Sequence, residues 1–301
     1  MIFLFSVVFL SFSCKKKDIT PAYLVLSDDD FKDCIENSRS AFNKTHNVDY
    51  DEETFQVVRQ QYFRDVYVSL NGKTLGYWNL PCTIPLLPDY SSENIVRIIP
   101  CVRVPGTSVT TLIYNFVKPV ERAIVVEKKG EYRLSDFFFE YREGISFPFL
   151  ETFGQIHNFS SVDTVNNCAP LNIIPGESMG EILLNDSLPF FNIVTGFETI
   201  LGTNCKHFWE FMYKSDGEMT TYLNFRGAAS GATQATLAVY PSTKGVWKKA
   251  YIDISEQVQM AAFGASAISV RLGMRGIRNA DESTACFQFK YVKLISMVSY
   301  Y

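Results

Sequence analysis

The feature that most constrains the fold is a close succession of short strand-like segments in the second half of the chain. Each segment is apolar or alternates between apolar and polar residues, and Gly, Asn, Asp or Ser residues separate it from the next. Strands this frequent, without a long amphipathic helix, predict a jelly-roll-like or galactose-binding-like β-sandwich over residues 145–301. The predicted strands are 148–153, 171–174, 181–184, 190–200, 207–214, 219–226, 233–240, 247–254, 267–274 and 285–294.

A shorter series of strands precedes this block. Residues 65–70 and 73–78 flank Asn71-Gly72, the dipeptide that favours a two-residue hairpin turn. Further strand-like runs follow, and prolines punctuate them, which confines those positions to edges, bends or strand starts. The sequence therefore predicts an immunoglobulin-like sandwich over residues 22–144, so that the fold class is all-β.

A polar stretch interrupts the predicted first sandwich near residues 28–53. It is rich in charged side chains, and Phe31, Cys34 and Ile35 recur in it at helix-like spacing. We expect an insertion that holds one short helix.

The last predicted strand changes its alternation partway. Phe287, Phe289 and Tyr291 share one face by parity, whereas Val292 and Leu294 fall on the opposite face. A strand has a side-chain period of two, so this switch predicts either a β-bulge or burial on both sides.

The N-terminus has the pattern of an export signal. Residues 2–12 are apolar except for two serines, and Cys14 and three lysines follow. The apolar run is too short to span a bilayer and has the length of a signal-peptide core. A cysteine just after this run resembles the lipobox of bacterial lipoproteins. We therefore predict a signal peptide over residues 1–13, lipid attachment at Cys14, and a tether over residues 14–21 that anchors the protein to a membrane.

The other six cysteines would meet an oxidising compartment after export. Cys82 and Cys101 each follow a proline, and the segment between them has the pattern of a hairpin, so we expect a disulfide between this pair. The alternative is that all six are small buried side chains.

Charge and motif content exclude several functions. The chain has 28 Lys and Arg against 32 Asp and Glu, which argues against a nucleic-acid partner, since such proteins need a basic face. The three histidines are scattered and no CxxC motif occurs, so we expect no metal. No phosphate-binding loop is present, and we expect no cofactor.

One string has the form of a catalytic motif. Residues 176–180 read Gly-Glu-Ser-Met-Gly, the pattern of a nucleophile elbow with Ser178 as nucleophile. The elbow needs a helix after the serine, but residues 181–184 have the pattern of a strand. The partners Asp186 and His207 would also crowd into one further hairpin. We therefore predict a protein that is not an enzyme, with a serine esterase as a remote alternative.

The aromatic side chains offer another type of site. The 25 Phe, 16 Tyr and three Trp residues belong mainly to cores, because large aromatic side chains dominate burial in β proteins. Tyr77 and Trp78 follow the Asn-Gly turn and are our candidates for ligand stacking.

Several segments resemble a known group of proteins. The runs 65–76 and 84–87, together with 21–24 and 247–254, resemble uncharacterised Bacteroidota outer-membrane lipoproteins. The second half also resembles the jelly rolls of carbohydrate-binding modules.

The resemblance implies a lipid-anchored outer-membrane protein that faces either the periplasm or the cell surface. We expect a non-catalytic binding or scaffolding subunit whose partner is an outer-membrane protein. The alternative is a glycan-binding lipoprotein that uses residues 145–301.

Overall fold

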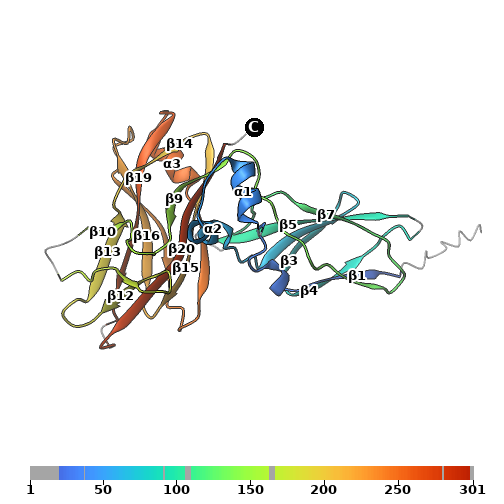
Figure 1. The fold of residues 1–301 in the computed structure, drawn as a ribbon, viewed down its shortest axis with the longest axis horizontal. Helices are drawn as coiled ribbons and strands as arrows, with labels where there is room; N and C mark the ends of the chain where they lie inside the picture. The colour runs from blue at the N-terminus through green and yellow to red at the C-terminus, as the bar shows by residue number, and fades with distance from the viewer. Residues whose placement is uncertain are drawn as a thin grey trace, which may run out of the picture.

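The computed structural model describes residues 20–36, 38–90, 92–105, 110–162, 167–279 and 281–298. It confirms the all-β class, since the strands form two β-sandwiches that follow one another along the long axis of the molecule (Figure 1). The finer assignments, immunoglobulin-like and jelly-roll-like, stay predictions. Cys14 and the predicted signal peptide before it lie outside the described residues.

The first sandwich contains two sheets. One has the order β4-β1-β8, and the other has the order β3-β2-β5-β6 with β7 also paired to β5. Asn71 and Gly72 both have positive φ and join β2 to β3, so the predicted hairpin is confirmed. The strands are β1 (Ala22–Leu26), β2 (Asp65–Leu70), β3 (Lys73–Asn79), β4 (Cys82–Leu86), β5 (Asn94–Val104), β6 (Thr110–Ile113), β7 (Val120–Ile124) and β8 (Glu131–Arg133).

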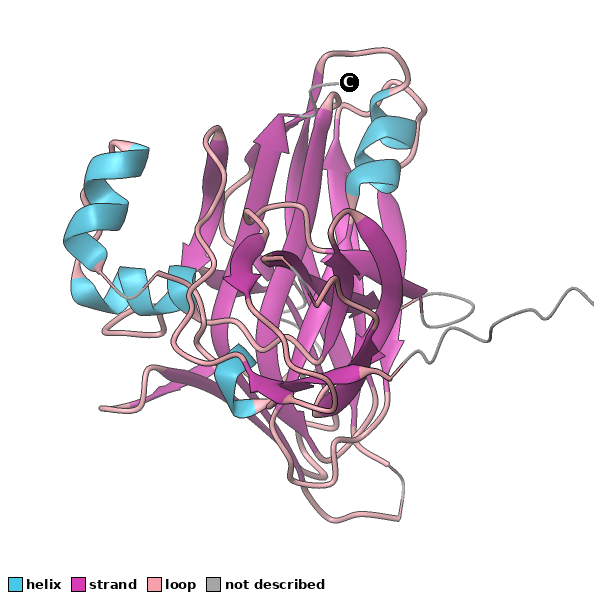
Figure 2. Ribbon diagram, turned by 90° about the vertical axis from the view of Figure 1, so that its right-hand side faces the viewer, coloured by secondary structure: helices cyan, strands magenta, loops and turns pink. Residues whose placement is uncertain are grey.

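The insertion holds more helix than its sequence indicated. A 3₁₀ turn, η1 (Asp29–Phe31), precedes the helices α1 (Arg39–His46) and α2 (Glu52–Arg59), and α2 extends beyond the predicted end of the insertion. Ser38 and Asp51 cap α1 and α2 by accepting hydrogen bonds from backbone N–H groups. Figure 2 shows that the helices lie at the margins of the strand layers.

The second sandwich also contains two sheets. The near sheet, which faces the first sandwich, has the order β11-β12-β20-β15-β18 with β9 paired to β20. The far sheet has the order β10-β13-β19-β16-β17 with β14 paired to β19, and it lies on the side away from the first sandwich (Figure 1). A helix, α3 (Ser255–Ala262), follows β18.

The sequence placed most of these strands correctly, but the predicted strand 190–200 is divided into β13 and β14. The near-sheet strands are β9 (Ile145–Glu151), β11 (Asn172–Ile174), β12 (Met179–Leu184), β15 (Cys205–Ser215), β18 (Lys248–Asp253) and β20 (Ala285–Val298). The far-sheet strands are β10 (Phe159–Ser161), β13 (Phe190–Thr195), β14 (Thr199–Gly202), β16 (Met219–Arg226), β17 (Gln234–Tyr240) and β19 (Ala267–Ile277).

The change of alternation in β20 is a β-bulge. Its register against β15 shifts at Tyr291, which has a φ of 52°. Before the bulge Phe287 and Phe289 point into the core of the second sandwich, and after it Val292 and Leu294 do. The prediction of a bulge is confirmed. Its effect is to turn Lys293 away from that core and toward the first sandwich.

The two sandwiches share a packed junction. Phe208, Tyr251 and Ile295 extend from the near sheet into the hydrophobic core of the first sandwich. There Phe208 meets Tyr114 and Tyr251 stacks near Phe63, with ring centroids 6.1 and 6.4 Å apart. The side of the near sheet that an isolated sandwich would expose to water is therefore buried here.

Within the described ranges, no helix combines the length and apolar character needed to cross a bilayer. The same residues contain no group of three or more His, Cys, Asp or Glu side chains that could hold a metal ion.

Candidate functional site

The outer face of the far sheet carries a ladder of polar side chains. By alternation, every second residue of β16 points outward, and each lies directly opposite a residue of β19. Apolar residues of the same strands, such as Leu223 and Leu272, point into the core. The opposed outward pairs are Thr220 with Arg275, Tyr222 with Gly273, Asn224 with Arg271, and Arg226 with Ser269.

Tyr222 is fixed at the centre of this face. Its ring covers Gly273, where an added Cβ would lie 2.2 Å from the ring. Its hydroxyl donates a 2.5 Å hydrogen bond to Oδ1 of Asn192, and the guanidinium of Arg275 lies 5.9 Å from the ring centroid. Burial raises the pKa of Tyr222 to about 12, so the hydroxyl stays protonated and acts as a donor.

Two hollows lie on this face. The first, with a volume of about 250 Å³, combines apolar surface from Phe190 and Ile277 with polar side chains. The second, with a volume of about 340 Å³, is more polar. The polar lining is Asn192, Glu218, Thr220 and Arg275 in the first hollow, and Glu198, Asn224, Arg226, Ser269 and Arg271 in the second.

The charges on this face are partly paired. Glu198 accepts a 2.9 Å hydrogen bond from Arg226, and its Oε1 lies 3.9 Å from Nη2 of Arg271. Arg275 is exposed beside the first hollow. The face thus offers guanidinium and amide donors, carboxylate acceptors and apolar surface side by side. This chemistry suits a ligand rich in hydroxyl groups.

The predicted stacking residues lie on the first sandwich. Tyr77 is 56% exposed on the outer face of β3, whereas Trp78 is partly buried and packs against the core of that sandwich. Alternation along a strand sends neighbouring side chains to opposite faces, so only one of the two can face solvent. Neither belongs to the far sheet.

The structure does not form the predicted disulfide. Cys82 and Cys101 are both free thiols. The prediction assumed that one hairpin joins them, but β4 pairs with β1 in one sheet and β5 pairs with β2 in the other. Burial raises the pKa of Cys82 to about 11 and that of Cys101 to about 12, which leaves both thiols protonated.

The sequence that resembles a nucleophile elbow, residues 176–180, forms a turn that leads into β12. Ser178 has a φ of 45° and closes the short connection between β11 and β12, so a strand follows it where a hydrolase would have a helix. His207 is buried, and its ring nitrogens lie 2.7 Å from Ser296 Oγ and 2.8 Å from the Gly202 carbonyl. Asp186 accepts a hydrogen bond from Arg278. These contacts leave the three residues in separate environments.

A set of buried polar side chains at the junction was missed at the sequence level. The junction cluster comprises Gln61, Tyr114, Tyr141, Glu210, Lys249, Tyr251 and Lys293. Its centre is Glu210, which accepts hydrogen bonds from Tyr114 at 2.5 Å and from Gln61 at 2.9 Å. Nζ of Lys293 and Nζ of Lys249 lie 3.6 and 3.8 Å from the same carboxylate.

Lys293 links the two sandwiches by hydrogen bonds to backbone carbonyls. Its ammonium donates to the carbonyls of Val57, Val58 and Gln60 at 3.1, 2.6 and 3.0 Å. These carbonyls lie at the C-terminal end of α2, where the helix dipole favours a positive charge. Burial lowers the pKa of Lys293 to about 7 and that of Lys249 to about 8, although Glu210 opposes both shifts.

Known proteins offer little more than a distant likeness. No family model matches the chain, and no curated protein matches it. Among solved structures, a family 29 carbohydrate-binding module from Piromyces equi is 9% identical, with a TM-score of 0.33 over 51% of this chain and 89% of that chain. Two mutants of a family 29 module, one complexed with cellulohexaose and one with mannohexaose, are each 8% identical, with a TM-score of 0.31. Each covers 50% of this chain, and 88% and 89% of the respective module.

Proposed function

We propose that this protein is a non-catalytic, lipid-anchored glycan-binding protein whose ligand lies across the outer face of the far sheet. The observation that carries the proposal is the arrangement around Tyr222. Its buried ring packs on Gly273 between the two hollows, and the exposed Arg275, whose guanidinium lies 5.9 Å from the ring centroid, lines the first hollow. A site that is held in place before the ligand arrives loses little conformational freedom on binding.

A sugar matches the lining of the two hollows. Its ring carries hydroxyl groups that both donate and accept hydrogen bonds, and it also presents C–H surface. Arg275 and Asn192 provide donors, Glu218 provides acceptors, and Phe190 and Ile277 provide apolar contact in the first hollow. The second hollow extends the polar lining along the same strands, which suits a chain of sugars.

The same lining favours a glycan over the protein partner that we expected first. Cores of protein interfaces are depleted of charged residues, and Lys, Glu and Asp are under-represented there. On this face, the carboxylates of Glu218 and Glu198 line the first and the second hollow.

The proposed anchor suits this orientation. Cys14 lies before β1 in the chain, and β1 lies at the end of the molecule opposite the far sheet (Figure 1). Attachment of lipid at Cys14 would therefore hold the protein by its first sandwich. We propose that it resides at the outer membrane, with the far sheet directed away from the lipid.

The test is binding of the purified protein to an array of defined oligosaccharides. We expect saturable binding to at least one glycan and a loss of about 10-fold or more in Arg275→Ala, because one hydrogen bond to a charged group contributes about 1.5–3 kcal/mol. Arg133→Ala changes an exposed arginine on the first sandwich and is the matched control. Absence of saturable binding to any glycan would refute the proposal.

A further inference from the structure

The first sandwich has its own aromatic surface, which the proposed function does not use. Tyr67 on β2 and Tyr77 on β3 are directly opposed, and their rings meet edge to face with centroids 5.3 Å apart. A 2.6 Å hydrogen bond between the hydroxyls of Tyr67 and Thr74 fixes the first ring. Tyr77 is exposed, and its contact with this fixed ring holds it in place. We name this surface the tyrosine face.

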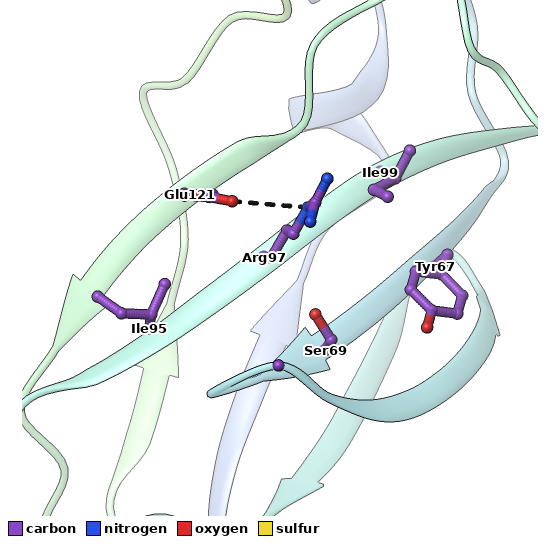
Figure 3. A pocket seen from close by; sticks show the side chains of 7 residues that line it. Tyr67, Ser69, Ile95, Arg97, Ile99 and Glu121 are labelled. Carbon is purple, nitrogen blue, oxygen red and sulfur yellow. Dashed lines mark ion pairs between the residues drawn. The ribbon is translucent and has the colours of Figure 1, made fainter. Parts of the chain in front are cut away.

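A hollow of about 270 Å³ lies on one side of the pair, as Figure 3 shows. Arg97 on β5 and Glu121 on β7 lie side by side in its lining, directly opposed in register, with Nε and Oε1 3.6 Å apart. This distance is too long for a good hydrogen bond, so both groups keep hydrogen-bonding capacity for a ligand. The labelled lining is Tyr67, Ser69, Ile95, Arg97, Ile99 and Glu121.

A second hollow of about 250 Å³ lies on the other side, where the two sandwiches meet. Tyr77 lines it from β3, and Lys206 and Asp253 line it from the near sheet. Nζ of Lys206 and Oδ2 of Asp253 are 3.8 Å apart, and the lysine side chain is 45% exposed. A loose ion pair therefore lies on each side of the tyrosine pair, Arg97 with Glu121 on one side and Lys206 with Asp253 on the other.

We propose that the tyrosine face is a second saccharide-binding site, independent of the far sheet. The rings of Tyr67 and Tyr77 would contact the C–H faces of sugar rings. Arg97 with Glu121, and Lys206 with Asp253, would each bind neighbouring hydroxyl groups, since each pair supplies a donor and an acceptor. The two hollows on either side of the aromatic pair suit a linear oligosaccharide.

The geometry of β3 favours a saccharide over an extended peptide. β3 is an edge strand, and a peptide would bind such an edge by adding a strand. Its register against β2 shifts between Val68 and Ser69, and Gly76 has a φ of 111°. A bulge of this kind twists the edge and disfavours the pairing of another strand.

The experiment measures binding of the full chain to immobilised cellohexaose, mannohexaose, xylohexaose and chitohexaose. In the Arg275→Ala background, which weakens the far-sheet site, we expect binding to at least one probe to remain. Adding Tyr77→Ala should then reduce that affinity about 10-fold or more, which corresponds to about 1.4 kcal/mol, because it removes the exposed ring of the pair. Phe138→Ala removes a comparably exposed aromatic side chain of the first sandwich and should change nothing.

Tyr77→Phe keeps the ring and should retain affinity within about twofold, which separates loss of stacking from loss of the fold. The proposal is overturned if Tyr77→Ala binds every probe as the parent does. It is also overturned if Arg275→Ala alone abolishes all binding. If Arg275→Ala has no effect while Tyr77→Ala abolishes binding, the far-sheet proposal fails and the tyrosine face stands.

Discussion

Replacing Lys293 by methionine tests whether the junction cluster holds the two sandwiches together. The substitution keeps an unbranched side chain but removes the ammonium group, which donates hydrogen bonds to three backbone carbonyls at the C-terminal end of α2. It also takes one of two cations from Glu210, which is fully buried. Removing one partner of a buried ion pair typically costs about 3–5 kcal/mol, and we expect the free energy of unfolding at pH 7 to fall by that amount.

The pH dependence gives a sharper signature than the loss itself. The pKa of Lys293 is about 7 in the folded protein, below its ordinary value of 10.5 in the unfolded chain. Between these values the unfolded chain binds more protons, so the contribution of Lys293 to stability rises with pH. The stability difference between parent and Lys293→Met should therefore grow as the pH rises from 7 to 8.5.

The assay is urea unfolding at pH 7.0 and 8.5, followed by the fluorescence of the three tryptophans, of which Trp209 is fully buried in the second sandwich. Lys290→Met is the control. It lies on the same strand, and Nζ of Lys290 is 3.9 Å from a partly exposed Glu177, so it should cost less than about 1 kcal/mol. The reasoning is refuted if the two variants are equally stable, or if the difference between Lys293→Met and the parent does not change with pH.

Three further predictions concern the far sheet, the hairpin and the thiols. Gly273→Ala places a Cβ 2.2 Å from the Tyr222 ring, so the free energy of unfolding measured in urea should fall by about 1–3 kcal/mol. The same variant should bind glycan more weakly. Unchanged binding would show that Tyr222 does not support the site. Gly72→Val forces a branched residue to a φ of 75° and should cost about 1–2 kcal/mol, measured by thermal unfolding, whereas an unchanged Tm would contradict the strain. Dithiothreitol should leave the Tm unchanged because Cys82 and Cys101 are free, and a lower Tm after reduction would indicate a disulfide.

Local chemistry made part of this fold predictable. Asn71-Gly72 determines the first hairpin because both residues adopt positive φ at little cost. The parity of Phe289 and Val292 likewise predicted either a bulge or burial on both sides, and the strand has a bulge between them. These inferences succeeded because each depends on neighbours in the chain.

The failures concern contacts between distant segments. Cys82 and Cys101 are close in sequence, but their strands pair into different sheets. Glu210, Lys249 and Lys293 occupy outward positions of otherwise alternating strands, a pattern that is typical of a solvated face. Only the docking of the first sandwich reveals that they are buried. The far-sheet site escaped notice for the same reason, since the opposition of β16 and β19 follows from register over a long sequence separation.

The bulge at Tyr291 also affects how β20 can tolerate insertions and deletions. The residues before it and the residues after it alternate in opposite phase, and the single extra residue reconciles them. Deleting Tyr291 alone would remove the extra residue and restore regular alternation from Phe289 to Val292, so that Lys293 and Leu294 would keep their present sides. Deleting two residues there would reverse the phase, directing the Lys293 ammonium into an apolar core and Leu294 toward Glu210. A one-residue deletion at the bulge should therefore be tolerated better than a two-residue deletion.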